Sequence, residues 1–166
     1  MTLLQFLLNL EATPLAAAMR GESGWEWLFP IIETIQFLGL ATVFGSILMV
    51  DLRLLGWTSR SVVVSRLSSE ILPLTWGAYA VAAVTGSLMF IAKAHNYFFN
   101  LQFELKFLCM LLAGTNMLIF HYGICRTVPA WDSQLPPPIA AQSAGAVSVI
   151  LWMGVVFFGR WIGFTS

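Results

Sequence analysis

Four stretches of apolar residues dominate the chain, and each is long enough to cross a bilayer as a helix, which takes about 20 residues. They cover about residues 30–55, 73–94, 101–125 and 140–164. Proline, which is tolerated in the first turn of a helix, stands near three of the four starts, at Pro30, Pro73 and Pro138. The pattern therefore predicts an all-α fold, an integral membrane four-helix bundle over residues 26–166.

Local signals predict where several helices begin and end. Asn100 is a suitable N-cap for the third span, and Gly56 a suitable stop after the first. Near the start of the chain, Thr13 followed by Pro14 predicts an N-cap and the first residue of a short helix that reaches Arg20.

Residues 1–25 form a segment of their own. The apolar run at the start carries no positive charge and is interrupted by Glu11, so a secretory signal peptide is not expected. We expect two short helices that lie in the membrane interface. Trp25 and Trp27 would mark the interface where the first span enters the bilayer.

Composition supports a membrane location and excludes a nucleic-acid binder. Of the 166 residues, 58% are hydrophobic and 10% charged, whereas soluble domains carry about 25% charged residues. Eight Lys and Arg balance eight Asp and Glu. The chain is therefore expected to contact the lipid bilayer.

Small residues spaced four apart, such as Gly159-x-x-x-Gly163, predict close packing between helices. This packing can occur within the bundle, with other membrane subunits or with a second copy of the chain.

The distribution of basic residues predicts the orientation. The connection after the first span carries Arg53, Arg60 and Arg66, whereas Lys106 and Arg160 fall inside spans. Cytoplasmic loops are rich in Lys and Arg, so we expect this connection in the cytoplasm and both termini on the opposite side of the membrane.

Three charged residues inside spans form the first candidate site. Because the spans alternate in direction, Glu33, Lys106 and Arg160 are expected on the same side of the membrane. One interpretation is an ion pair between Glu33 and Lys106 or Arg160 that holds helices together. The other is a polar site for a quinone head, a haem propionate or a proton path.

A second group is expected on the opposite side. Asp51 and Arg53 end the first span and His121 nears the end of the third, with Asn116 one to two turns before it. We interpret Asp51, Arg53 and Asn116 as a structural polar cluster that closes this face of the bundle.

The two histidines limit the redox chemistry. His121 lies about 20 residues, or roughly 30 Å, along the third span, whereas His95 precedes that span. The two cannot ligate one iron within one copy of the chain, so haem b would need a single histidine, for which His121 is the candidate, a methionine as second ligand, or a site shared with a partner chain. The sequence contains no HExxH, P-loop or G-x-S-x-G motif, so no catalytic residue and no metal site is assigned.

A set of short motifs is similar to a known group of proteins. These motifs are Leu10-Glu11-Ala12-Thr13-Pro14-Leu15, Pro30-Ile31-Ile32-Glu33, Asp51-Leu52-Arg53-Leu54-Leu55-Gly56, Ala113-Gly114-Thr115-Asn116, Phe120-His121 and Gly159-Arg160-Trp161-Ile162-Gly163-Phe164. They resemble a bacterial family of small four-helix inner-membrane proteins that is known only as a domain of unknown function. The resemblance implies a four-helix fold and a bacterial inner-membrane location, which would place both termini in the periplasm, but it implies no reaction.

One position departs from the pattern of that family. Its members usually have a histidine just before the Leu38-Gly39-Leu40-Ala41 stretch, where this chain has Gln36. A neutral amide is a poor ligand for haem iron, although it can form hydrogen bonds to a carbonyl or a neighbouring helix.

Three functions are compatible with these features. The first is a non-catalytic accessory or structural subunit of a bacterial membrane electron-transfer complex. The alternative is a membrane redox protein that binds haem b or quinone through the candidates His121, Gln36, Glu33, Lys106 and Arg160. A transporter or channel is the third, and the absence of inverted repeats in the sequence argues against it.

Overall fold

The computed structural model describes residues 2–57, 64–123, 128 and 137–165. The described residues form helices and turns, without a strand. The helices, in chain order, are α1 (Leu3–Glu11), α2 (Pro14–Met19), α3 (Leu28–Leu54), α4 (Val64–Ala92), α5 (Ala94–Phe98), α6 (Leu101–Tyr122) and α8 (Ile139–Thr165).

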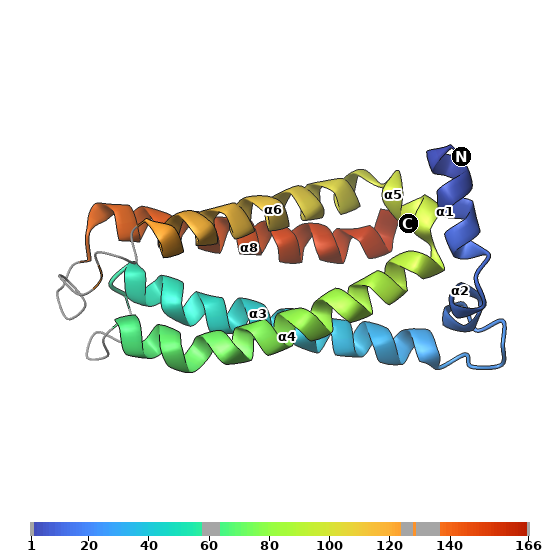
Figure 1. Cartoon of the computed structure of the whole chain (residues 1–166), viewed down its shortest axis with the longest axis horizontal. Helices are drawn as coiled ribbons and strands as arrows, with labels where there is room; N and C mark the ends of the chain where they lie inside the picture. Colours follow the sequence, from blue (N-terminus) through green and yellow to red (C-terminus); the bar gives the residue numbers. More distant parts are fainter. Residues whose placement is uncertain (1, 58–63, 124–127, 129–136, 166) are drawn as a thin grey trace.

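Four of these helices, α3, α4, α6 and α8, are long and apolar enough to cross a membrane. They pack as two pairs, α3 with α4 and α6 with α8, and the pairs meet mainly where α3 contacts α8 (Figure 1). Within the apolar window of each span, 28% of α8 is buried but only 6% of α6. The predicted four-helix membrane bundle is therefore confirmed, with α8 more enclosed than α6.

The short helices α1 and α2 lie at the end of the bundle where both termini are found, and α1 runs across that end (Figure 1). The Thr2 hydroxyl accepts the N–H of Gln5, and the Thr13 hydroxyl accepts that of Ala16, so both helices have side-chain N-caps. The cap at Thr13 and the helix start at Pro14 are as predicted. Their placement in the membrane interface stays a prediction.

The start of α6 at Asn100 and the end of α3 at Gly56 have the local structure that the sequence predicts. The side chain of Asn100 accepts the backbone N–H groups of Gln102 and Phe103 and caps α6. At the end of α3, Gly56 has a φ of 75°, a left-handed conformation that glycine adopts without strain.

The start of the second span was predicted wrongly. Pro73 lies inside α4, which already begins at Val64. An interior proline removes one backbone hydrogen bond, and α4 is nevertheless helical on both sides of Pro73. In the part of α4 before the proline, Arg66 and Glu70 form an exposed ion pair, one turn apart, at 2.9 Å.

One cluster of buried hydrophobic residues lies at the end of the bundle away from the termini. Leu54, Val64, Val128 and Ala141 form one buried cluster. Elsewhere, most large apolar side chains on the spans are exposed on the chain itself. This is expected for spans whose outer faces contact lipid or another membrane protein.

Candidate functional site

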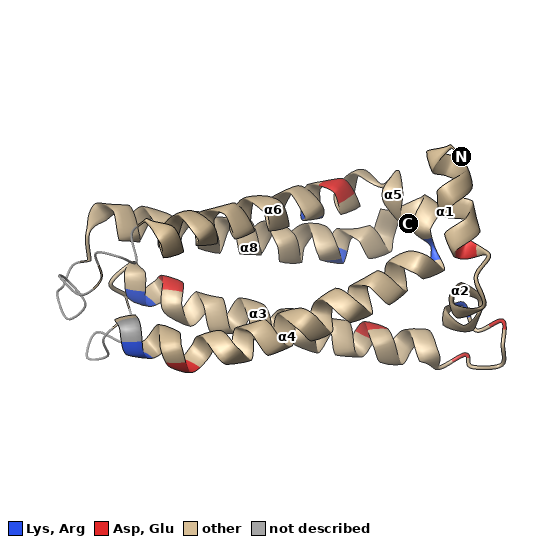
Figure 2. Cartoon of the chain, in the orientation of Figure 1, with Lys and Arg blue, Asp and Glu red and all other residues tan. Residues whose placement is uncertain are grey.

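The predicted ion pair of Glu33 is not formed. Glu33 is exposed in the second turn of α3, and Arg160 is exposed near the end of α8. Among the described residues, Glu33 forms no ion pair with Lys106 or Arg160. Lys106 instead lies over α8, where its Nζ is 3.5 Å from the position that a Cβ atom on Gly159 would take. Figure 2 shows the charged residues spread along separate helices.

Three aromatic rings stack where α4, α5 and α6 meet. Phe103 of α6 stacks on Phe90 of α4 and on Tyr97 of α5, with ring centroids 5.5 and 6.0 Å apart. Burial raises the pKa of Tyr97, and the negative charge of Glu33 raises it further. Glu33 and Tyr97 are therefore within electrostatic reach of each other, next to the three stacked rings.

Gln36 links α3 to α4. Its amide oxygen accepts a hydrogen bond from the hydroxyl of Thr85, which also bonds the carbonyl of Val81 at 2.7 Å. Gly86 gives the amide room, since a Cβ there would lie 3.2 Å from Nε2 of Gln36. Gln36 thus makes a polar contact between α3 and α4.

Two members of the predicted polar cluster, Asp51 and Asn116, contact α8. Asp51 shares a hydrogen bond with Ser148, and Nδ2 of Asn116 donates to the carbonyl of Ala144 at 3.0 Å. Ala144 and Ser148 lie one turn apart, so Asp51 from α3 and Asn116 from α6 contact the same stretch of α8. Arg53 is completely buried near the end of α3. The hydrogen bond between Asp51 and Ser148 joins α3 of one helix pair to α8 of the other, whereas the bond between Asn116 and Ala144 joins α6 to α8 within one pair.

The two histidines lie at opposite ends of the bundle. His121 is exposed in the last turn of α6, with its ring against that of Tyr122. His95 lies in α5, beside Phe99 at the other end. Gln36 is 18 residues before the end of α3, or roughly 27 Å along the helix, and His121 lies near that end. Gln36 and His121 therefore do not form one site.

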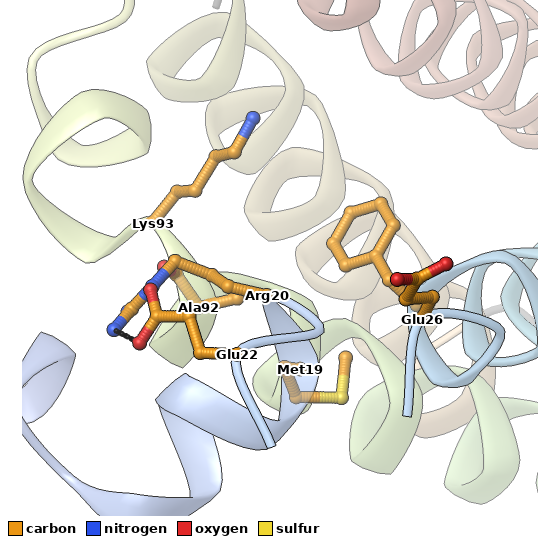
Figure 3. Close-up of a pocket in the computed structure, with 7 residues that line it drawn as sticks. Met19, Arg20, Glu22, Glu26, Ala92 and Lys93 are labelled. Carbon is orange, nitrogen blue, oxygen red and sulfur yellow. Dashed lines mark hydrogen bonds and ion pairs between the residues drawn. The ribbon is translucent and has the colours of Figure 1, made fainter. Parts of the chain in front are cut away.

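An open hollow of about 450 Å³ lies at the end of the bundle where both termini are found. Figure 3 shows its lining, which comes from α2, the connection that follows it, the first turn of α3 and the end of α4. Its lining residues are Met19, Arg20, Glu22, Glu26, Phe29, Ala92 and Lys93. Sequence reasoning gave no indication of this hollow.

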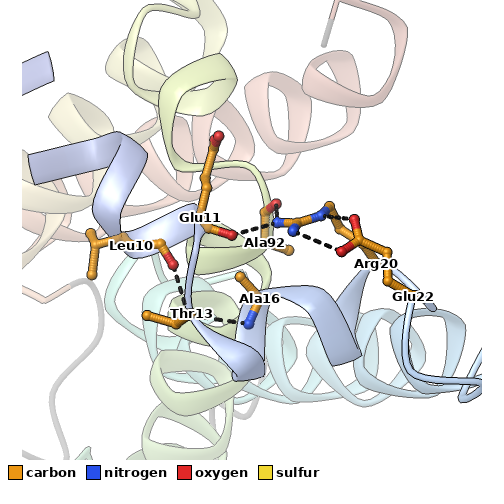
Figure 4. Close-up of polar contacts among 7 residues, drawn as sticks. All are labelled: Leu10, Glu11, Thr13, Ala16, Arg20, Glu22 and Ala92. Atoms are coloured by element: carbon orange, nitrogen blue, oxygen red, sulfur yellow. Dashed lines mark hydrogen bonds and ion pairs between the residues drawn. The ribbon is translucent and has the colours of Figure 1, made fainter. Parts of the chain in front are cut away.

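Arg20, in the wall of the hollow, joins three segments (Figure 4). Its Nη1 donates to the carbonyl oxygens of Glu11 and Ala92, at 3.0 and 3.2 Å. These carbonyls stand at the C-terminal ends of α1 and α4, where helices lack internal donors and carry partial negative charge. A cation at this point satisfies both helix ends at once.

Two glutamates complete this junction. Glu22 accepts from Nε and Nη2 of Arg20, at 2.6 and 3.2 Å, and Arg20 holds the pKa of that carboxyl below its usual range. The carboxylate of Glu11 accepts the backbone N–H of His95 in the first turn of α5, at 2.8 Å. We call Arg20, Glu11, Glu22 and their two backbone partners, Ala92 and His95, the N-terminal clamp. Of these contacts, the pairing of Arg20 with Glu22 is the one that sequence can predict, because the two residues are two positions apart.

The sequence profile of a family of unknown function, DUF6644, matches residues 28–165. The match begins at the first residue of α3 and ends at the last residue of α8, so it contains all four spans. No curated protein and no solved structure matches the chain. The resemblance to an uncharacterised membrane family is thereby confirmed, and the chain belongs to DUF6644, a family whose function is unknown.

Proposed function

We propose that this multi-pass membrane protein is a non-catalytic accessory subunit of a larger bacterial inner-membrane complex, of the electron-transfer class. The observation that supports this proposal is the exposed Glu33, which has no ion-pair partner in the described chain although it lies on a membrane span. Charges on a span are costly against lipid, by roughly 2.5–3.5 kcal/mol at the helix centre. A neighbouring subunit with a cation or hydrogen-bond donors at this level would remove that cost.

Site-directed crosslinking tests the proposal in the native membrane. Phe37 lies one turn after Glu33 and is 66% exposed, so a photo-crosslinking amino acid there should capture the partner. Leu118 on α6, 51% exposed, provides a control position on another face. We expect a specific protein adduct from position 37 that carries a redox centre in its optical spectrum. An adduct without a redox centre would reject the electron-transfer class. If position 37 gave no more adduct than the control position, the accessory role would be rejected.

Glu33→Gln separates assembly from folding. Because Glu33 has no ion-pair partner in the described chain, the isolated variant should unfold at the same temperature as the parent, while the yield of the adduct from position 37 falls. Glu70→Gln is the matched control, since it removes a carboxylate from α4 at the opposite end of the bundle. Equal adduct yields from both variants would count against a role of Glu33 in assembly.

A quinone-binding redox protein is the second candidate, favoured by the stack of Phe90, Phe103 and Tyr97, with Lys106 one turn after Phe103 on α6. Lys106 and Tyr97 carry donors that a quinone carbonyl could accept, and aromatic rings pack well against a quinone head. Titration with a soluble quinone analogue, followed by tryptophan fluorescence, should then saturate in the parent and weaken in Lys106→Met. Identical titrations of parent and variant would reject this site.

Haem b is tested separately, because His121 is its candidate ligand. A reduced-minus-oxidised absorption spectrum of protein from its native membrane should show a Soret band that His121→Ala removes. A band of unchanged height in the variant would dismiss His121 as the ligand.

The proposed orientation places both termini in the periplasm. Both ends of the described chain lie at the same end of the bundle, which supports a shared side (Figure 1). A phosphatase that is active only in the periplasm, fused after Ser166, should be active, and a fusion after Gly56 should be inactive. The reverse pattern would invert the topology.

A further inference from the structure

The hollow beside the N-terminal clamp contains four charged side chains whose formal charges sum to zero. Arg20 and Lys93 are the cations, and Glu22 and Glu26 the anions. Arg20 and Glu22 already neutralise each other through two hydrogen bonds. Among the described residues, Lys93 and Glu26 form no ion pair, so one cation and one anion remain available to a ligand.

These two available charges come from different segments. Lys93 stands between α4 and α5, whereas Glu26 lies in the connection just before α3, and Figure 3 shows the two side chains well apart. A ligand that uses both must therefore carry a negative and a positive group at separate positions. A simple anion would be repelled by Glu26, and a simple cation by Lys93.

The remaining lining is apolar and continues into the spans. Met19 and Ala92 are almost completely buried, and Phe29 belongs to the first turn of α3. The hollow also lies at the level where α3 begins and α4 ends, next to the exposed Trp25 and Trp27. Tryptophan at the ends of spans is typical of the headgroup region of a bilayer.

We propose that this hollow binds the headgroup of a phospholipid that carries a phosphate and a primary amine. The phosphate pairs with the ammonium of Lys93, and the amine of the lipid donates hydrogen bonds to Glu26. A primary ammonium donates such bonds to a carboxylate, whereas a quaternary ammonium has no N–H to donate. An ethanolamine headgroup is therefore preferred over choline, and both over a glycerol headgroup with only negative charge.

The N-terminal clamp makes this site rigid. Arg20 fixes α2 to the carbonyl of Ala92, directly before Lys93, and Glu11 fixes α1 to the backbone N–H of His95, directly after the same region. The backbone on both sides of Lys93 is thus held before a lipid arrives. A preorganised wall lowers the entropy cost of binding.

The test uses the full chain, purified in detergent, with ethanolamine, choline or glycerol phospholipids of identical acyl chains added to the micelles. Thermal unfolding is followed by tryptophan fluorescence, and native mass spectrometry counts the bound lipids. We expect the ethanolamine lipid to raise the unfolding temperature most. In Glu26→Gln, the concentration of ethanolamine lipid that gives half of the maximal stabilisation should rise about tenfold. It should then equal the concentration of choline lipid that the variant requires. Lys93→Gln should weaken binding of all three lipids, because each carries the phosphate.

Several results would overturn the proposal. Equal stabilisation of the parent by all three lipids, or the largest effect from the glycerol lipid, would contradict recognition of a zwitterion. Soluble phosphoethanolamine that stabilises as well as the lipid would assign the hollow to a soluble ligand. Glu70→Gln, at the other end of the bundle, is the control for general effects of charge and should behave as the parent does.

Discussion

Arg20 donates a hydrogen bond to the backbone carbonyl of Ala92, 72 residues further along the chain, at a distance of 3.2 Å. The same guanidinium bonds the carbonyl of Glu11 and the carboxylate of Glu22. Two helix ends and one connection are therefore joined by one side chain. The first residues of the chain, which lie outside the part that matches the family, are attached to its second span in this way.

Replacing Arg20 should detach this segment while the four spans stay folded. Arg20→Gln keeps a side chain of similar length but loses the charge and most of the donors. We expect the unfolding temperature in detergent to fall by about 2–4 °C, because about 1 kcal/mol is typical of such hydrogen bonds. Limited proteolysis should also cut residues 2–24 faster. Arg66→Gln, which removes an exposed pair within α4, should change neither measurement.

Acid should loosen the same clamp. The pKa of Glu22 is lowered in the folded protein by its hydrogen bonds to Arg20. A group whose pKa is lowered on folding adds stability above its unfolded pKa, and that stability is lost as the pH falls through the lower, folded value. Cleavage of residues 2–24 should therefore accelerate below the ordinary titration range of glutamate. In Glu22→Gln that acceleration should be smaller, and an identical pH profile in the variant would contradict the assignment.

Gly145 sets the distance between α3 and α8. A Cβ atom there would lie 3.1 Å from the carbonyl oxygen of Asp51 and 3.2 Å from Cβ of Leu54. Neither atom can move without shifting α3, so Gly145→Ala should cost about 1–3 kcal/mol, more than alanine gains in a helix. In Gly163→Ala, on the same helix, the new methyl meets nothing within 4 Å and stability should not fall. Unfolding in increasing SDS compares the two variants.

The sequence was sufficient to predict the spans because an uninterrupted apolar run is a local signal. The caps at Thr13 and Asn100 were also predictable, since each acts on N–H groups two or three residues away. Pro73 misled the prediction of a helix start, because a proline in the first turn and one in the interior look the same in a hydropathy pattern. The two positions of a proline can be distinguished only when the residue at which α4 begins is known.

The candidate site was less predictable, because its contacts depend on how the helices pair. The expected depth of Glu33 and Lys106 followed from counting residues, but whether they meet depends on which helices are neighbours. α3 packs with α4 and α8, whereas Lys106 on α6 lies against α8. The interaction between Arg20 and Ala92 likewise joins segments without any shared sequence pattern. Composition and periodicity contain no information on such contacts.

The hydrogen bond between Gln36 and Thr85 should stabilise the pairing of α3 with α4. Thr85→Val keeps the shape of the side chain but leaves the amide oxygen of Gln36 without its donor in an apolar setting, whereas Thr85→Ser keeps the hydroxyl. Polar contacts between membrane helices are worth about 0.6 kcal/mol on average and up to about 1.7 kcal/mol. The free energy of unfolding of Thr85→Val should therefore fall by an amount within that range. Adding Gln36→Leu to Thr85→Val should lower it only a little further, because the two side chains share one interaction. Refolding of the four proteins from SDS gives this coupling energy, and strictly additive losses would show that Gln36 and Thr85 contribute independently.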